Sequence, residues 1–236
     1  SSWGIMCPSE TPDGANIGVR KNISLLANIT TGTNSTNLIK LLYTSGLENI
    51  LQVEKQKLLN STKVFLNERL IGYTKNPLFM TQKLKLLKRN ALINIYTSIA
   101  WYKTYNIIKI STDSGRGIRP VFVVNNNKIN ITKKDLDDIK ANRKNWYNLV
   151  GGTKQSEFSD TDDKYYNTKD IEMDIEMSID MLKETSGIIE YIDSEESNTS
   201  LIALNPCDLD SKITYDYCEI SPSLILGVLA GNIPAI

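Results

Sequence analysis

Two charged stretches of the sequence have residue types and spacings that could do chemistry. In the first, Asp193, Glu195 and Glu196 place three carboxylates within four residues, which could hold a metal ion or supply a catalytic carboxylate pair. The other interpretation is a solvated turn between two strands. We favour the turn, because no second carboxylate cluster is tied to this one in the sequence.

The second charged stretch contains Asp113, Arg116 and Arg119 within seven residues. These side chains could hold one another across a turn through charge-assisted hydrogen bonds. The alternative that assigns them a function is a site for the phosphate group of a nucleotide. We predict the structural role, because Arg–Asp pairs that are partly buried often serve structure alone.

Cysteine and histidine chemistry is restricted by the composition. The chain has no histidine, and its three cysteines, Cys7, Cys207 and Cys218, show no C-x-x-C spacing. A zinc site built from cysteine and histidine needs four such ligands in close pairs, so we predict no zinc site in this chain. An odd number of scattered cysteines is typical of a reducing compartment.

A turn-rich stretch opens the sequence. Pro8, Pro12 and the pair Asp13-Gly14 lie within seven residues, which forbids a continuous helix and predicts an ordered, turning loop. Glycines in such a loop allow another backbone to approach closely. The loop leads into Arg20-Lys21, two cations placed to meet a phosphate group.

The elements that must position these residues are short. We predict an α+β fold with short mixed strands and helices in two or three small subdomains. Helices are expected around 38–42, from Asn76-Pro77 to about Arg89, over 133–149, over 171–185, and from Pro222 through Val228. The second of these should have a basic face, made of Lys83, Lys85, Lys88 and Arg89. The third should turn its apolar side chains inward, namely Leu136, Ile139, Trp146 and Leu149. Strands are expected in 62–73, closed by Gly72, at 107–110 and 121–124 around a loop 111–120, and at 187–192 and 201–204; the polar stretch 152–170 is predicted to be a linker.

The charge is distributed unevenly along the chain. Residues 1–150 hold 22 Lys or Arg against 9 Asp or Glu, a net +13, and residues 151–236 hold 5 against 18, a net −13. The basic part is suited to a polyanion, although two solvated surfaces that happen to differ would give the same counts. No run of about 18 apolar residues could span a membrane, so we expect no membrane partner.

Four motifs, in order along the chain, resemble the second-largest (beta-type) subunit of multisubunit DNA-directed RNA polymerases. Residues 3–25, WGIMCPSETPDGANIGVRKNISL, are similar to W-G-x-x-C-P-x-E-T-P-[DE]-G-x-x-x-G-L-x-K-N-x-S-L, with Val19 in place of Leu. Residues 112–122, 190–196 and 217–227 resemble T-D-x-G-R-x-x-R-P-L-F, E-Y-I-D-x-E-E and H-C-E-I-H-P-S-x-I-L-G. Tyr217 and Ser221 replace two histidines of the last motif, which puts the contacts of those histidines in doubt.

The resemblance implies a division of the chain and a role for its first loop. Residues 1–60 would be a segment of the fork region, 61–150 an external 1-like domain, 151–206 an external 2-like domain, and 207–236 the start of the hybrid-binding domain. Arg20 and Lys21 are the side chains expected to touch nucleic acid, with Glu10, Thr11, Asp13 and Asn16 shaping the fork.

The reaction implied is template-directed nucleotidyl transfer by the whole assembly. Its magnesium is held mainly by the largest subunit, so this chain would bind no cofactor and have no activity alone. The implied partners are the largest subunit, other polymerase subunits, template DNA and the RNA–DNA hybrid. The location would be the nucleus for a cellular eukaryotic enzyme, or the virion or host cytoplasm or nucleus for a viral one.

The ends of the sequence predict a piece of a longer subunit. It has no initiating Met, and Asn232–Ile236 follow an apolar stretch without a polar tail. Two alternatives stay open. One is a free-standing nucleic-acid-binding module that uses the basic part of the chain; the other is a split-gene product that serves as a structural piece.

Overall fold

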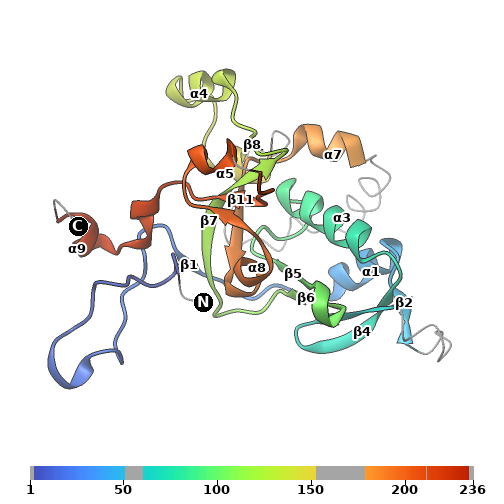
Figure 1. Ribbon diagram of the computed structural model, residues 1–236. Helices are drawn as coiled ribbons and strands as arrows, with labels where there is room; N and C mark the ends of the chain where they lie inside the picture. Colours follow the sequence, from blue (N-terminus) through green and yellow to red (C-terminus); the bar gives the residue numbers. More distant parts are fainter. Residues whose placement is uncertain (1–2, 51–60, 153–178, 211, 234–236) are drawn as a thin grey trace. The chain divides into compact units, whose positions relative to one another are not determined.

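The structure is a computed structural model that describes residues 3–50, 61–152, 179–210 and 212–233. The chain forms two compact units, which combine segments distant in sequence. Unit 1 comprises Ser1–Thr30, Gly115–Asn130 and Ile189–Ile236, and unit 2 comprises Thr31–Ser114 and Ile131–Ile188. Short helices and mixed strands make up both, which confirms the predicted α+β class (Figure 1). The four consecutive segments assigned from the sequence stay a prediction.

Unit 1 is organised around one long strand, β7 (Gly117–Asn125), which pairs antiparallel with four others. A fifth strand joins the sheet through the parallel pair β10–β11. Val121 and Val123 of β7 pack with Ile192 and Tyr217 in a small core. The other strands are β1 (Asn28–Ile29), β8 (Lys128–Ile129), β9 (Ile189–Asp193), β10 (Ile202–Ala203) and β11 (Tyr217–Cys218); the helical segments are α8 (Ser194–Thr199), α9 (Val228–Gly231) and the 3₁₀ turns Gly14–Asn16, Pro206–Asp210 and Pro222–Ile225.

Pro120 lies in the middle of β7, where a proline is unusual because it has no N–H to donate. β9 pairs along this stretch, whereas β1 reaches only to Ile118 and β11 begins opposite Phe122. Among the described residues, the proline therefore falls where one side of β7 has no neighbouring strand. The loop predicted over 111–120 is accordingly shorter, since β7 already begins at Gly117.

Unit 2 contains a five-stranded sheet in the order β2-β4-β3-β6-β5. β3 and β4 form a hairpin whose turn residues, Asn67 and Glu68, have φ of 47° and 64°, the left-handed values that a tight two-residue hairpin turn requires. Gly72 was predicted to close this element, but it lies inside β4. The strands are β2 (Glu48–Asn49), β3 (Thr62–Leu66), β4 (Arg69–Thr74), β5 (Ser98–Tyr102) and β6 (Ile107–Ser111), with a 3₁₀ turn at Lys103–Tyr105.

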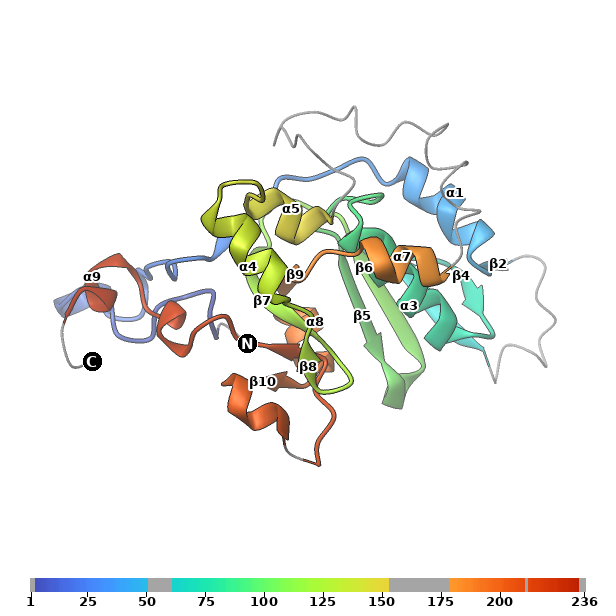
Figure 2. The same ribbon diagram turned by 90° about the horizontal axis from the view of Figure 1, so that it is seen from above.

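Helices α1 (Thr36–Thr44) and α3 (Pro77–Arg89) form the core of unit 2 with this sheet. Figure 2 shows α3 beside β5 and α7 (Ile179–Thr185), and α3 contacts both of these elements. The predicted start of α3 at Asn76-Pro77 is confirmed, with Pro77 in the first turn. The predicted basic face is wrong in part, because Lys88 is only 2% exposed.

The predicted helix over 133–149 is wrong as a single element. The chain forms α4 (Lys133–Lys140) and α5 (Trp146–Gly151), separated by Asn142 with a φ of 53°. The inward face is also different: Leu136 is 43% exposed, whereas Asp135 and Asp138 are buried. These two carboxylates hold Lys144 and Arg143 in ion pairs, and this polar pairing overrides the apolar pattern.

Asp135 is the structural centre of α4. Its carboxylate accepts hydrogen bonds from the Thr132 backbone N–H at 2.8 Å and from Lys144 Nζ at 2.6 Å, and Thr132 in turn caps the helix. Burial alone would raise the pKa of Asp135, but the hydrogen bonds from Lys144 and Thr132 outweigh it and lower that pKa to about 2. The ionised form is therefore the one that stabilises the fold.

Asp135→Asn should lower the free energy of unfolding by about 2 kcal/mol at neutral pH, since it removes the charge from these hydrogen bonds. The folded pKa lies below the ordinary value of 3.8, so the contribution is present above about pH 4 and is lost as the pH falls toward 2. Urea unfolding followed by circular dichroism at pH 7 and pH 2.5 measures this. Asp137→Asn, at an exposed position of the same helix, is the control; equal effects of both variants at pH 7 would contradict the assignment.

The remaining differences concern the C-terminal part. The acidic stretch predicted as a solvated turn instead leads from the end of β9 into the short helix α8. Asp193, which caps this helix, is 3% exposed, and Glu196 within it is 1% exposed. The helix predicted from Pro222 through Val228 is broken into a 3₁₀ turn and α9, because Leu226 and Gly227 are extended. Of the helix predicted over 171–185 the structure describes α7; residues 153–178, which include most of the predicted linker, lie outside the described residues.

Candidate nucleic-acid interface

Two ion pairs join the last three motifs within unit 1. Arg116 Nη1 lies 2.9 Å from Asp193 Oδ2, and the Asp193 side chain is 4% exposed. Arg119, on β7, binds the carboxylate of Glu219, which directly follows β11; both side chains are buried. Asp193 also accepts the backbone N–H of Glu196 at 2.9 Å and so caps α8.

These ion pairs extend beyond the second motif, and the pairing predicted within that motif stays a prediction. The sequence suggested that Asp113 would hold the two arginines across a turn, but the partners seen here lie 77 and 100 residues further along the chain. Sequence reasoning missed Glu219 as a partner. The available signal was that the second motif holds two arginines, whereas the third and fourth motifs hold carboxylates.

The first motif packs directly on this ion-paired layer. Gly4 has a φ of +68°, and a Cβ placed on it would lie only 2.5 Å from Cδ of Arg119. Gly117 likewise leaves room for the side chain of Ile5. The chain then turns out and back, since the Cys7 N–H donates to the Asn22 carbonyl at 2.9 Å and the Ser24 N–H to the Ile5 carbonyl at 3.0 Å. Trp3–Asn22 is thus the turning loop that was predicted, with no regular helix beyond the 3₁₀ turn Gly14–Asn16.

The outer part of this loop, residues 11–21, we call the arm; it is the projecting blue segment in Figure 1. Gly14 and Gly18, with φ of +76° and +74°, make its bends. The carbonyl of Asn16 accepts the backbone N–H groups of Val19 and Arg20 at 3.1 and 3.3 Å. The arm therefore has a defined shape of its own.

Glu10 stands at the base of the arm and has a structural partner. Its carboxylate accepts the backbone N–H of Ala230 at 2.8 Å, in the first turn of α9, and Gly227 leaves the space that this carboxylate occupies. This glutamate was predicted to shape a nucleic-acid site. The structure places it where it joins the first motif to the fourth.

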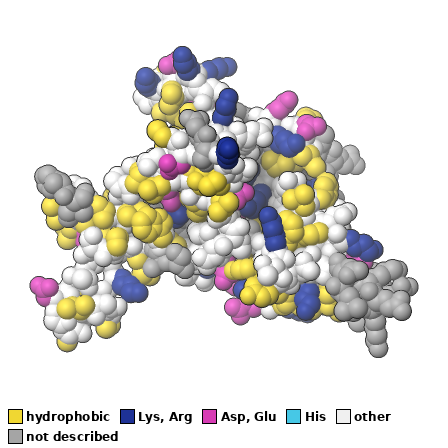
Figure 3. Space-filling model, viewed as in Figure 1, with side chains coloured by type: hydrophobic (Ala, Val, Ile, Leu, Met, Phe, Trp, Pro, Cys, Tyr) yellow, Lys and Arg dark blue, Asp and Glu magenta, His cyan; other side chains and the backbone are white. Residues whose placement is uncertain are grey.

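Arg20 and Lys21 occupy the returning side of the arm and are exposed. Within the described part of the chain, neither makes a hydrogen bond or an ion pair through its side chain. Asp13 and Asn16 are also exposed. Ile17 and Val19 are 62% and 78% exposed, so the arm presents apolar and basic side chains to solvent, as the lower left of Figure 3 shows.

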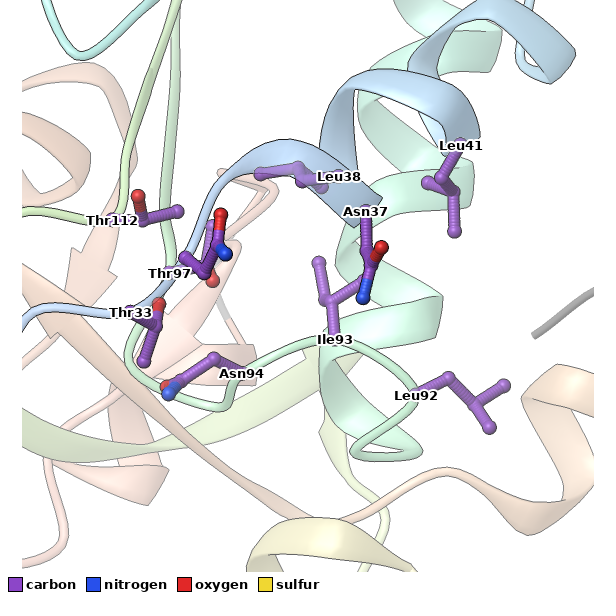
Figure 4. A pocket seen from close by; sticks show the side chains of 10 residues that line it. Thr33, Asn37, Leu38, Leu41, Leu92, Ile93, Asn94, Thr97 and Thr112 are labelled. Carbon is purple, nitrogen blue, oxygen red and sulfur yellow. The ribbon is translucent and has the colours of Figure 1, made fainter. Parts of the chain in front are cut away.

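A hollow of about 280 Å³ lies at the foot of the arm. Trp3, Met6 and Pro8 give it an apolar side, and Arg20 and Lys21 line it as well. A second hollow, in unit 2, has a volume of about 30 Å³ and room for little more than water (Figure 4). The asparagine and threonine side chains that line it include Asn37, Asn94 and Thr97, and it is too small for a substrate.

The carboxylates and thiols of the described residues are not arranged for metal chemistry. No three of these side chains gather where one ion could bind within the described ranges. Asp193 and Glu219 are each held by an arginine, which opposes binding of a cation such as magnesium at these two carboxylates. Burial raises the pKa of the Cys218 thiol to about 11, with Glu219 and Asp208 adding to the shift, so this thiol stays protonated at neutral pH.

Comparison with known proteins gives consistent matches along the chain. Three family models match: RNA polymerase Rpb2 domain 3 at residues 1–29, domain 4 at 64–125 and domain 5 at 179–222. The relatives include the DNA-directed RNA polymerase II subunit RPB2 of Encephalitozoon cuniculi, 33% identical over 98% of this chain, and RNA polymerase II subunit 2 of Arabidopsis thaliana, 31% identical over 99%. The archaeal subunit Rpo2 of Sulfolobus acidocaldarius is 30% identical over 99%.

The motifs, the fold and these matches define a class of protein, the large subunits that make up multisubunit RNA polymerases. Within it, the chain belongs to the Rpb2 family of second-largest subunits of DNA-directed RNA polymerases. The chain spans about a fifth of the length of these relatives, covering 18% of the first two and 19% of the archaeal one. The matches give no support to a free-standing binding module. None of the described helices is long and apolar enough to cross a membrane.

Proposed function

We propose that this chain forms part of the wall of the active-centre cleft of a DNA-directed RNA polymerase, where the arm meets nucleic acid. The observation that carries this proposal is the pair of exposed cations, Arg20 and Lys21, on a loop that the first, second and fourth motifs hold in place. Cations of this kind bind phosphate groups irrespective of base sequence.

The side chains of this region have two different roles. Arg119, Glu219 and Glu10 serve to fix the arm, and Arg20 and Lys21 supply the contact. The chain contributes no group to nucleotidyl transfer; the magnesium ion and its ligands belong to the largest subunit, which is the proposed partner together with the other subunits, template DNA and the RNA–DNA hybrid. Its location is that of the polymerase: the nucleus for a eukaryotic cellular enzyme, or the virion or host cell for a viral one.

Charge reversal at Arg20 or Lys21 tests the contact. In the assembled polymerase, Arg20→Glu and Lys21→Glu should each weaken binding of nucleic acid and reduce transcription. The matching neutral variants, Arg20→Gln and Lys21→Gln, should each lower the slope of log affinity against log salt concentration by about one. The measurement is binding of a fluorescent transcription scaffold at several salt concentrations.

Lys40→Glu provides the matched control. Lys40 is exposed on α1 in unit 2 and should leave both the affinity and the salt slope unchanged. Wild-type affinity and slope in both arm variants would rule out the contact. Nucleotide addition by the purified chain alone would contradict the proposal that it lacks catalytic groups.

A further inference from the structure

The hollow at the foot of the arm combines two chemistries in one place. Trp3 and Met6 line it and are 51% and 40% exposed, so an aromatic residue and a thioether residue reach the surface there. Arg20 and Lys21 line the same hollow and lack ion-pair partners within the described residues. Exposed aromatic rings next to cations are the arrangement that binds unpaired bases of nucleic acids.

The size of the hollow restricts its occupant. About 280 Å³ is close to the lower limit of about 300 Å³ for small-molecule pockets, so a group the size of one nucleotide fits and a duplex does not. The acidic side chain in the lining, Glu10, directs its carboxylate to the Ala230 N–H on α9. The lining therefore holds the two cations Arg20 and Lys21 against this one carboxylate, a formal net charge of +1.

We propose that this hollow binds a single nucleotide of a single-stranded nucleic acid, with the base against the Trp3 ring and the phosphate at Arg20 and Lys21. The inference rests on the proposed function and deepens it, because it names the structural form of nucleic acid that the arm recognises. An indole ring stacks on any base, so the site is expected to be tolerant of sequence.

The experiment uses the assembled polymerase on a scaffold whose unpaired strand carries one 2-aminopurine, moved one position at a time. Stacking quenches the fluorescence of 2-aminopurine. At one position of the strand the fluorescence should therefore be strongly quenched by the wild-type polymerase, and Trp3→Ala should restore it. Trp3→Ala should also weaken binding of the scaffold about tenfold. Trp3→Phe keeps a ring and should retain most of the quenching and affinity, whereas Trp146→Ala, at a tryptophan 37% exposed in unit 2, should change neither.

The outcomes separate the two proposals. Loss of affinity and salt dependence in the Arg20 and Lys21 variants, with unchanged quenching in Trp3→Ala, would overturn the stacking site and leave the phosphate contact standing. No effect in any of these variants would overturn both. Quenching is taken relative to the same nucleic acid without polymerase; an equal added quenching of a fully paired scaffold, or of free 2-aminopurine ribonucleotide at the same concentration, would contradict a single-stranded occupant. If the Trp3→Ala variant fails to assemble, the positional scan of 2-aminopurine is compared between the wild type and Trp3→Phe. The absence of any strongly quenched position in the wild type would then refute the site.

Discussion

Replacing Arg119 by methionine is expected to lower the free energy of unfolding by about 3–5 kcal/mol, because it leaves the buried Glu219 carboxylate without its cation. Methionine keeps an apolar stem of similar length, so the loss reports the charge rather than the packing. Glu219→Gln in the Arg119→Met background should recover more than half of the loss, since the unpaired charge is then gone. Thermal unfolding of the single and double variants gives the comparison.

An exposed ion pair in the same chain provides a reference for the loss of unfolding free energy expected at Arg119. Lys75 Nζ lies 2.5 Å from Glu48 Oε1, with side chains 56% and 37% exposed, and solvent screens such a pair. Lys75→Met should therefore cost no more than about 1 kcal/mol. If Arg119→Met costs no more than Lys75→Met, the buried pair is not what holds the motifs together.

Gly4→Ala is expected to have the second largest effect, because two penalties act at one position. A left-handed φ costs a residue with a Cβ about 1–2 kcal/mol, and the overlap with Cδ of Arg119 adds about 1–3 kcal/mol. The new methyl group also displaces the guanidinium from Glu219. In the assembled enzyme we therefore expect weaker nucleic-acid binding as well as a lower melting temperature.

Gly18→Ala separates the two penalties. Gly18 has a φ of +74°, similar to that of Gly4, but a Cβ there would meet nothing within 4 Å. It should show the backbone penalty alone, about 1–2 kcal/mol. Equal melting temperatures for the two variants would mean that Arg119 moves aside freely and does not depend on Gly4.

Features set by neighbouring residues could be predicted from the sequence. The start of α3 at Asn76-Pro77 and the turning loop of the first motif both depend on local backbone restrictions by proline and glycine. Arg20 and Lys21 are exposed beyond the bends at Gly14 and Gly18, whereas their predicted contact with a phosphate group stays a prediction.

Features set by distant residues could not be predicted in this way. The acidic stretch at 193–196 has the composition of a solvated turn, but Arg116 pairs with Asp193 from a motif 77 residues away, Asp193 and Glu196 are buried, and Ser194 begins the helix α8. Helix α4 has an apolar pattern that predicts Leu136 inside. The Asp135–Lys144 and Asp138–Arg143 pairs turn the other face inward, and a hydropathy pattern does not contain such pairs.

Unit 1 has a consequence for how the polypeptide matures. Its contacts join Gly4 to Arg119, Arg119 to Glu219, and Glu10 to Ala230, so the full set cannot form until Ala230 has left the ribosome. Contacts of such long sequence separation form slowly, whereas both chain segments of unit 2 are complete by Ile188. During synthesis, the arm and the apolar residues around Trp3 should therefore lack these contacts while unit 2 folds, which leaves an apolar segment exposed to association with other chains at that stage.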